Sequence, residues 1–192
     1  KTSKLHKIES IVTFVNLHDL IYLKLVNTKR HKVSFQGKFS EGIKKKNTVT
    51  TLLKLLDKKN LLNNKKLKIT IIKNIPQKSG MGGGSMNAAS LINFLLFKKI
   101  IKVKKKELIK LTKLIGSDVI LGIEPKNSIL TSTGLIRRYE KKIRFHTLIV
   151  KPNFGCSTKL IFSKVKSFSR SKFNLPKQSM FNVNYLKNLN ND

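Results

Sequence analysis

Residues 73 to 90, KNIPQKSGMGGGSMNAAS, gather the small side chains of the chain in one place. Four of the ten glycines lie within five positions of one another, and the only two alanines follow directly. Glycine adopts positive φ at little steric cost, so consecutive backbone N–H groups can turn toward one point. A helix that begins just after such a loop adds unpaired N–H donors and a partial positive charge. The stretch therefore predicts a binding site for a polyphosphate.

Two common phosphate-binding patterns do not fit this stretch. A Walker A loop needs Gly-Lys-Ser/Thr after its first glycine and four further residues, but Ser85 stands five positions after Gly80 and no lysine adjoins it. A dinucleotide fingerprint needs a third glycine where Ser85 stands. The stretch could instead be a flexible turn that binds no ligand, but its position between a strand and a helix disfavours this interpretation.

A strand and a helix should flank the loop and position it. KLKITIIKNI, residues 66–75, alternates apolar and polar residues, and MNAASLINFLLFKKI, residues 86–100, repeats apolar residues at helical spacing. Residues 47–60 also show helical spacing, and Asn47 suits the N-cap. The leucines expected on the inward face of that helix are Leu52, Leu53, Leu55 and Leu56.

The other segments indicate an α+β fold. Three β-branched runs at 8–16, 20–26 and 31–37 predict a small antiparallel set of neighbouring strands. Residues 104–115 predict a further helix, and strands are expected at 128–133 and 145–153. Because the first strands look like hairpins, α+β fits better than a doubly wound sheet.

The composition is strongly basic, with 41 lysines and arginines against nine acids and a net charge of +32. A positive net charge of this size attracts nucleic acid, so a basic RNA-binding module is the alternative function. The excess is almost wholly lysine and comes with much isoleucine and asparagine, a profile typical of A+T-rich codons. Aromatic residues are not interleaved with arginine as base-stacking sites would require. We therefore expect neither a specific nucleic-acid partner nor, since no apolar run is long enough, a membrane span.

The remaining reactive residues do not form a recognisable site. Cys156 is the only cysteine, which excludes an internal disulfide and agrees with a reducing, cytoplasmic compartment. His18, His31 and His146 lack metal-ligand spacing, so no protein metal site is predicted.

The stretch from Pro76 to Ala89, with its triple glycine followed by Ser-x-Asn-Ala-Ala, closely resembles the phosphate-binding motif of the GHMP kinases. It is most similar to the branch whose substrate is 4-diphosphocytidyl-2-C-methyl-D-erythritol, an intermediate of non-mevalonate isoprenoid biosynthesis. GSDVILGI resembles the family's Gly-Ala/Ser-Asp-Val-Pro segment, and SKLHKIESI resembles its cytosine-contacting motif. VNLHDLIYL is similar to the hydrophobic strand and the Asp that follow this motif in the family. LIVKPNFGCSTKLIF resembles the start of the second lobe.

The resemblance implies a two-lobed kinase that uses ATP with Mg²⁺ to phosphorylate the 2-hydroxyl of that small-molecule substrate. It implies a ribosomal protein S5 domain 2-like lobe over residues 1–142 and the start of a ferredoxin-like lobe over 143–192, in a monomer or homodimer. Asp118 would be catalytic, although by its position alone it could be a helix N-cap. His6 and Phe162 would hold the cytosine. The implied ATP-binding residues are Pro76, Gly80, Met81, Gly82, Gly83, Gly84, Ser85, Met86 and Asn87.

Three positions differ from the family pattern: Leu5 replaces a tyrosine, Met86 a serine and Ile120 a proline. The family's first strand and its last glycine-rich loop have no counterpart in the chain, so we expect both ends to be incomplete. A plastid-type compartment is therefore the alternative to a cytoplasmic location. Another GHMP kinase, such as homoserine kinase, is a further alternative, which the triple glycine with Asn87 and the His6 motif disfavour.

Overall fold

The computed structural model describes residues 9–131, 134–140, 146–150, 155, 163–165, 177, 179 and 181–188. The chain divides into two compact units. The larger is formed by residues 16–124 and 151–158, and the smaller by residues 1–15, 125–150 and 159–192. The glycine-rich loop belongs to the larger unit.

The larger unit is built on a three-stranded sheet in the order β2-β4-β3. Strand β2 (Leu20–Val26) is antiparallel to β4 (Lys66–Ile72), and β3 (Lys32–Gln36) is parallel to β4. Leu67, Ile69 and Ile71 of β4 are fully buried, whereas β2 and β3 alternate exposed and half-buried residues. The strand whose inward-facing side chains are all fully buried thus lies at the centre, where it buries the most apolar surface.

The expected antiparallel set over residues 8–37 is wrong. Strands β2 and β3 do not pair with each other, since β4 lies between them. Strand β1 (Ser10–Val12) pairs with β5 (Ser128–Leu130) in the smaller unit. A parallel pair needs a crossover, and here the helix α1 (Thr48–Lys58) connects β3 to β4.

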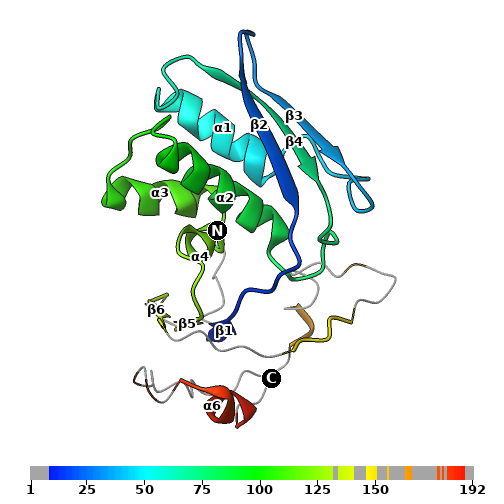
Figure 1. Ribbon diagram of the computed structural model, residues 1–192, viewed down its shortest axis with the longest axis vertical. Coiled ribbons are helices and arrows are strands. Elements are labelled where there is room, and N and C mark those ends of the chain that lie inside the picture. Colours follow the sequence, from blue (N-terminus) through cyan, green and yellow to red (C-terminus); the bar gives the residue numbers. More distant parts are fainter. Residues whose placement is uncertain are drawn as a thin grey trace. The chain divides into compact units, whose positions relative to one another are not determined.

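Four helices lie on one side of the β2-β4-β3 sheet (Figure 1). They are α1, α2 (Gly83–Phe97), α3 (Lys105–Ile115) and α4 (Val119–Ile123). The predicted helices are confirmed, and Leu52, Leu53 and Leu56 are buried as expected while Leu55 is partly buried. A Cβ built on Gly122 of α4 would lie 2.7 Å from Cβ of Ala89, so α4 packs closely against α2.

Helix α1 closes its own N-terminus. The Asn47 side chain accepts the Thr50 N–H at 3.0 Å, and the Thr50 hydroxyl oxygen accepts the Asn47 N–H at 3.0 Å. This capping box confirms Asn47 as the N-cap and satisfies two backbone donors reciprocally.

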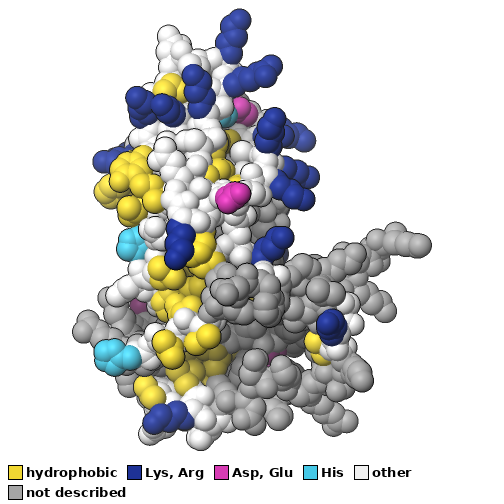
Figure 2. Space-filling model, turned by 90° about the vertical axis from the view of Figure 1, so that its right-hand side faces the viewer, with side chains coloured by type: hydrophobic (Ala, Val, Ile, Leu, Met, Phe, Trp, Pro, Cys, Tyr) yellow, Lys and Arg dark blue, Asp and Glu magenta, His cyan; other side chains and the backbone are white. Residues whose placement is uncertain are grey.

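The opposite face of the β2-β4-β3 sheet is exposed and carries a row of lysines among apolar and uncharged side chains. The strand register sets Lys24, Lys68 and Lys32 side by side across the three strands. Figure 2 shows a face of the molecule on which lysine and arginine side chains far outnumber acidic ones.

The smaller unit contains the antiparallel sheet β1-β5-β6, in which β6 (Ile136–Arg138) was not predicted. The rings of Tyr139 and Phe181 stack with their centroids 4.0 Å apart, next to the short helix α6 (Val183–Lys187). The strand expected at 145–153 is wrong for residues 146–150, which carry no regular structure. Among the described residues, none of the helices has the length and apolar character that crossing a membrane requires.

Candidate functional site

The glycine-rich loop connects the end of β4 to the start of α2, as the sequence predicts. The sign of φ alternates along it: Lys78, Gly80 and Gly82 have φ of +52°, +73° and +65°, and Ser79 and Met81 between them do not have positive φ. Alternating left- and right-handed residues turn successive N–H groups toward one concave side. The loop backbone therefore has the form of an anion-binding site.

The N-terminus of α2 is open. Its N-cap is Gly82, which provides no side-chain cap, and the Met86 N–H donates to the Gly82 carbonyl at 3.0 Å. By helix geometry, the N–H groups of Gly83, Gly84 and Ser85 have no acceptor within the helix. These donors and the helix dipole favour a negatively charged group at this end.

The close surroundings of the loop explain its small residues. A Cβ built on Gly83 would lie 3.0 Å from Cγ2 of Ile75, so a larger residue would push the start of the helix away from the loop. The Thr48 hydroxyl of α1 donates to the Gly84 carbonyl at 2.6 Å. The N-termini of α1 and α2 are thus joined at this point.

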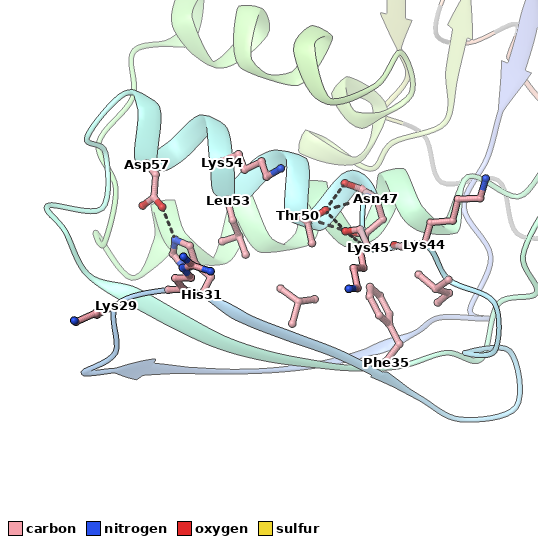
Figure 3. Close-up of a pocket in the computed structure, with 13 residues that line it drawn as sticks. Lys29, His31, Phe35, Lys44, Lys45, Asn47, Thr50, Leu53, Lys54 and Asp57 are labelled. Atoms are coloured by element: carbon pink, nitrogen blue, oxygen red, sulfur yellow. Dashed lines mark hydrogen bonds and ion pairs between the residues drawn. The ribbon is translucent and has the colours of Figure 1, made fainter.

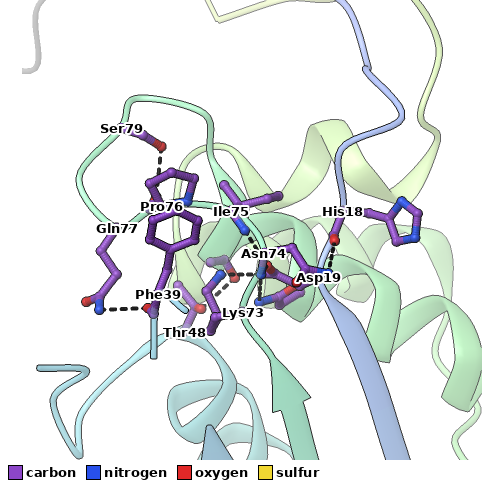
Figure 4. Close-up of polar contacts among 12 residues, drawn as sticks. His18, Asp19, Phe39, Thr48, Lys73, Asn74, Ile75, Pro76, Gln77 and Ser79 are labelled. Atoms are coloured by element: carbon purple, nitrogen blue, oxygen red, sulfur yellow. Dashed lines mark hydrogen bonds and ion pairs between the residues drawn. The ribbon is translucent and has the colours of Figure 1, made fainter. Parts of the chain in front are cut away.

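A buried carboxylate lies beneath the loop (Figure 4). Asp19, just before β2, forms an ion pair with Lys73, just after β4. The N–H groups of Asn74 and Ile75 each donate to Oδ1 of Asp19 at 2.8 Å, and the Asn87 amide donates to Oδ2 at 2.8 Å. The Asp19 side chain is fully buried and that of Lys73 is 6% exposed.

These contacts determine the charge of Asp19. Burial by itself raises the pKa of this carboxyl, but the hydrogen bonds from Lys73, Ile75, Asn87 and Asn74 outweigh it, and the pKa lies below the ordinary 3.8. Asp19 is therefore ionised at neutral pH.

Asp118 occupies the N-cap position of α4, but its side chain forms no cap hydrogen bond. Its carboxylate accepts a hydrogen bond from the Ser117 hydroxyl at 2.9 Å and is exposed. A Cβ built on Gly116 would lie 3.7 Å from Oγ of Ser85, so the segment that carries Asp118 runs beside the first turn of α2. The structure thus brings Asp118 to the same side of the unit as the loop.

The other predicted site residues are placed as follows. Met86 packs against Gly122, where an added Cβ would lie 2.9 Å from its sulfur, and Asn87 is 6% exposed. The Pro76 carbonyl accepts the Ser79 hydroxyl at 2.8 Å. His6 and Phe162 lie outside the described residues. The roles of all these residues stay predictions.

Sequence reasoning assigned no role to three polar residues that hold the loop, Asp19, Lys73 and Thr48, although the Asp in VNLHDLIYL matches the family pattern. Asp19 is one of only nine acids in the chain and directly precedes a strand. Lys73 directly precedes the loop, after the apolar strand β4. One of few acids next to an apolar strand, together with a lysine at the end of another strand, was the signal from which an ion pair could have been predicted.

A separate pocket of about 510 Å³ lies between β3 and α1 (Figure 3). Its apolar residues include Val33, Phe35 and Leu53, and several lysines line it. Asp57 in this pocket is hydrogen-bonded to His31 at 3.1 Å and to Lys66 at 2.9 Å. The predicted ATP-binding residues and Asp118 do not line this pocket. Within the described residues, no three His, Cys, Asp or Glu side chains are grouped so as to hold a metal ion.

The chain is similar to several known proteins. Residues 47–124 match the family described as GHMP kinases N terminal domain. A 4-diphosphocytidyl-2-C-methyl-D-erythritol kinase from Pelagibacter ubique (strain HTCC1062) is 60% identical, covering 100% of this chain and 68% of that protein. A protein of the same name from Anaplasma phagocytophilum (strain HZ) is 30% identical, covering 97% and 64%. Another from Petrotoga mobilis (strain DSM 10674 / SJ95) is 28% identical, covering 83% and 60%.

A solved structure titled "Crystal structure of 4-(cytidine 5'-diphospho)-2C-methyl-D-erythritol kinase" matches with a TM-score of 0.47 and 20% identity, over 64% of this chain and 42% of that one. The chain spans about two thirds of the length of the curated relatives, between 60% and 68% of those named above.

The family match and the mixture of helices and strands confirm the expected α+β GHMP kinase class. The identity to the Pelagibacter protein extends over the whole of this chain and over more than two thirds of that protein. The chain therefore belongs to the 4-diphosphocytidyl-2-C-methyl-D-erythritol kinases of the GHMP kinase family.

Proposed function

We propose that this chain forms part of an ATP-dependent kinase that phosphorylates the 2-hydroxyl of 4-diphosphocytidyl-2-C-methyl-D-erythritol in non-mevalonate isoprenoid biosynthesis. The observation that carries the proposal is the open N-terminus of α2, which follows a loop of alternating φ. The names of the relatives supply the substrate. They favour this function over a basic RNA-binding module and over other GHMP kinases.

The loop would bind the triphosphate through its backbone. The N–H groups of Gly83, Gly84 and Ser85 at the helix start would donate to phosphate oxygens, and the helix dipole adds to the attraction. When bound, ATP supplies the phosphoryl group and Mg²⁺ offsets its negative charge. Phosphoryl transfer depends mainly on positioning and charge stabilisation, so a loop that holds the phosphates in place is the main requirement.

Asp118 would act on the substrate hydroxyl. Its carboxylate is exposed, ionisable and not used as a helix cap, and its segment runs beside Ser85. In this position it would accept the hydroxyl proton or orient the hydroxyl toward the γ-phosphate. The Ser117 hydroxyl, which donates to this carboxylate, would fix its rotamer.

His6 and Phe162 are proposed to hold the cytosine of the substrate, as the family resemblance implies. The cytoplasmic location, a monomeric or homodimeric state, and a boundary between two lobes near residue 142 also stay proposals.

Phosphoryl transfer from labelled ATP to 4-diphosphocytidyl-2-C-methyl-D-erythritol by the complete protein tests the function. Asp118→Asn should lower kcat by about 10²- to 10⁴-fold and leave ATP binding intact. Gly83→Val should abolish ATP binding, because its side chain would collide with Ile75. A parent protein that binds ATP without transferring phosphate would contradict the substrate, and one that does not bind ATP would contradict the loop assignment.

A further inference from the structure

The Asp19 carboxylate accepts hydrogen bonds from four groups on two sides of the glycine-rich loop. Oδ1 accepts the N–H groups of Asn74 and Ile75, which lead into the loop. Oδ2 accepts Lys73 Nζ and the amide of Asn87, which lies in the first turns of α2. The chain from residue 76 to residue 86 thus begins and ends at positions held by one carboxylate.

The donors fill the acceptor positions of this carboxylate and exclude a direct chemical role. A carboxylate has about four lone-pair positions, and four donors occupy those of Asp19. Its side chain is fully buried. Neither ATP nor a substrate hydroxyl can reach it, so any effect on the reaction must act through the loop.

We propose that Asp19 is a positioning residue, which fixes the glycine-rich loop against the start of α2 so that the loop N–H groups converge on the ATP phosphates. The expected effect on ATP kinetics rests on the function proposed above, whereas the fixing of the loop by Asp19 does not. The pairing with Lys73 keeps the carboxylate charged, and a charged acceptor binds N–H donors more strongly than a neutral one.

A second ion pair at the other end of β4 provides a matched control. Lys66, the first residue of β4, pairs with Asp57, just as Lys73, just after β4, pairs with Asp19. Asp57 is 36% exposed and contacts His31 and Lys66 but no residue of the loop. Asp19→Asn and Asp57→Asn therefore remove the same charge from the two ends of one strand.

The experiment measures steady-state kinetics and hydrogen exchange in the complete protein, its Asp19→Asn and Asp57→Asn variants, and the double variant Asp19→Asn/Lys73→Met. In Asp19→Asn we expect KM for ATP to rise by about tenfold, because the phosphate donors lose their alignment. KM for the second substrate should change less than about twofold, since only uniform ATP binding is affected. Hydrogen exchange of residues 76–87 should accelerate in Asp19→Asn and not in Asp57→Asn.

The double variant separates positioning from stability. Lys73→Met removes the buried cation that Asp19→Asn leaves unpaired, so folding stability should recover. The proposal expects KM for ATP to stay raised in the double variant. Recovery of KM together with stability would overturn it, because Asp19 would then act only on the fold.

Hydrogen exchange tests the positioning role of Asp19 separately from the proposed kinase function. If the parent protein does not use ATP, the exchange of residues 76–87 still decides whether Asp19 holds the loop. Equal exchange in the parent and in Asp19→Asn would overturn the positioning role whether or not the parent is a kinase.

Discussion

The N-termini of α1 and α2 lie next to each other and are built in opposite ways. Helix α1 closes its first turn with the side chains of Asn47 and Thr50. Helix α2 begins at a glycine with no side chain to offer, although Thr48 joins the two helices through the Gly84 carbonyl. Glycine at the N-cap costs the helix only about a few tenths of a kcal/mol relative to a capping side chain.

The difference separates a helix start that is closed by its own side chains from one that has no side-chain cap. Helix α1 needs no external partner for the two donors in its capping box. Helix α2 keeps its donors free, and the groups that position it, Asp19 and Thr48, contact other atoms than those N–H groups. Four predictions test this contrast, in order of decreasing effect.

Of the four, Gly82→Val should have the largest effect, a fall of about 100-fold in kcat/KM for ATP. Gly82 has φ of +65° and open space around its Cβ position, so the substitution adds backbone strain alone. Gly134→Val is the matched control, since Gly134 has φ of +80° and equally open space. Steady-state kinetics of both variants give the comparison. Equal losses of kcat/KM in the two variants would contradict a special role for the N-terminus of α2.

Acid should loosen the start of α2 before that of α1. Because the pKa of Asp19 is lowered in the folded protein, its stabilisation is complete above pH 3.8 and is lost as the pH falls through the folded value. The cap of α1 is formed by an amide and a hydroxyl, which do not titrate there. Exchange protection factors of residues 73–87 and 47–51, measured from above pH 3.8 to well below it, should fall only for the first segment. A parallel loss in both segments would contradict the role of the carboxylate.

Asn47→Ala should lower the free energy of unfolding by about 1 kcal/mol, because it removes the capping box of α1. Asn47→Asp keeps an acceptor at the same place and should retain most of the stability. Urea unfolding of both variants measures the difference. If the two variants lost the same stability, the cap would not be the cause.

Thr48→Val should have the smallest effect, a loss of about 0.5 kcal/mol in the free energy of unfolding. The substitution removes one hydroxyl donor and nearly keeps the shape of the side chain. By helix geometry the Gly84 carbonyl still has a backbone donor within α2. Thr48→Ser serves as the control that keeps the hydroxyl. A loss above about 2 kcal/mol in urea unfolding would mean that the two helix starts depend on each other more than their single contact indicates.

Local sequence signals predicted the elements around the loop well. The position of the loop between a strand and a helix, the Asn47 cap and the buried Leu52, Leu53 and Leu56 are all confirmed. Each depends on residues within a few positions of one another, where periodicity and capping chemistry act directly.

Contacts between distant residues could not be predicted in the same way. Strand β4 lies between β2 and β3, whereas the order of the strands in the sequence suggested that β2 and β3 pair with each other. Asp19 meets Lys73 and Asn87 across 54 and 68 positions. One sequence offers no pairing signal over such distances, so the groups that hold the loop appeared only in the structure.

The central place of β4 also determines when the sheet can form during synthesis. Both of its edge strands precede β4 in the chain, and neither pairs with the other. A nascent chain that ends before Lys66 therefore carries two strands and no partner for either of them. The larger unit must wait for β4 to leave the ribosome, and until then its unpaired edges are the part of the chain most exposed to misassociation.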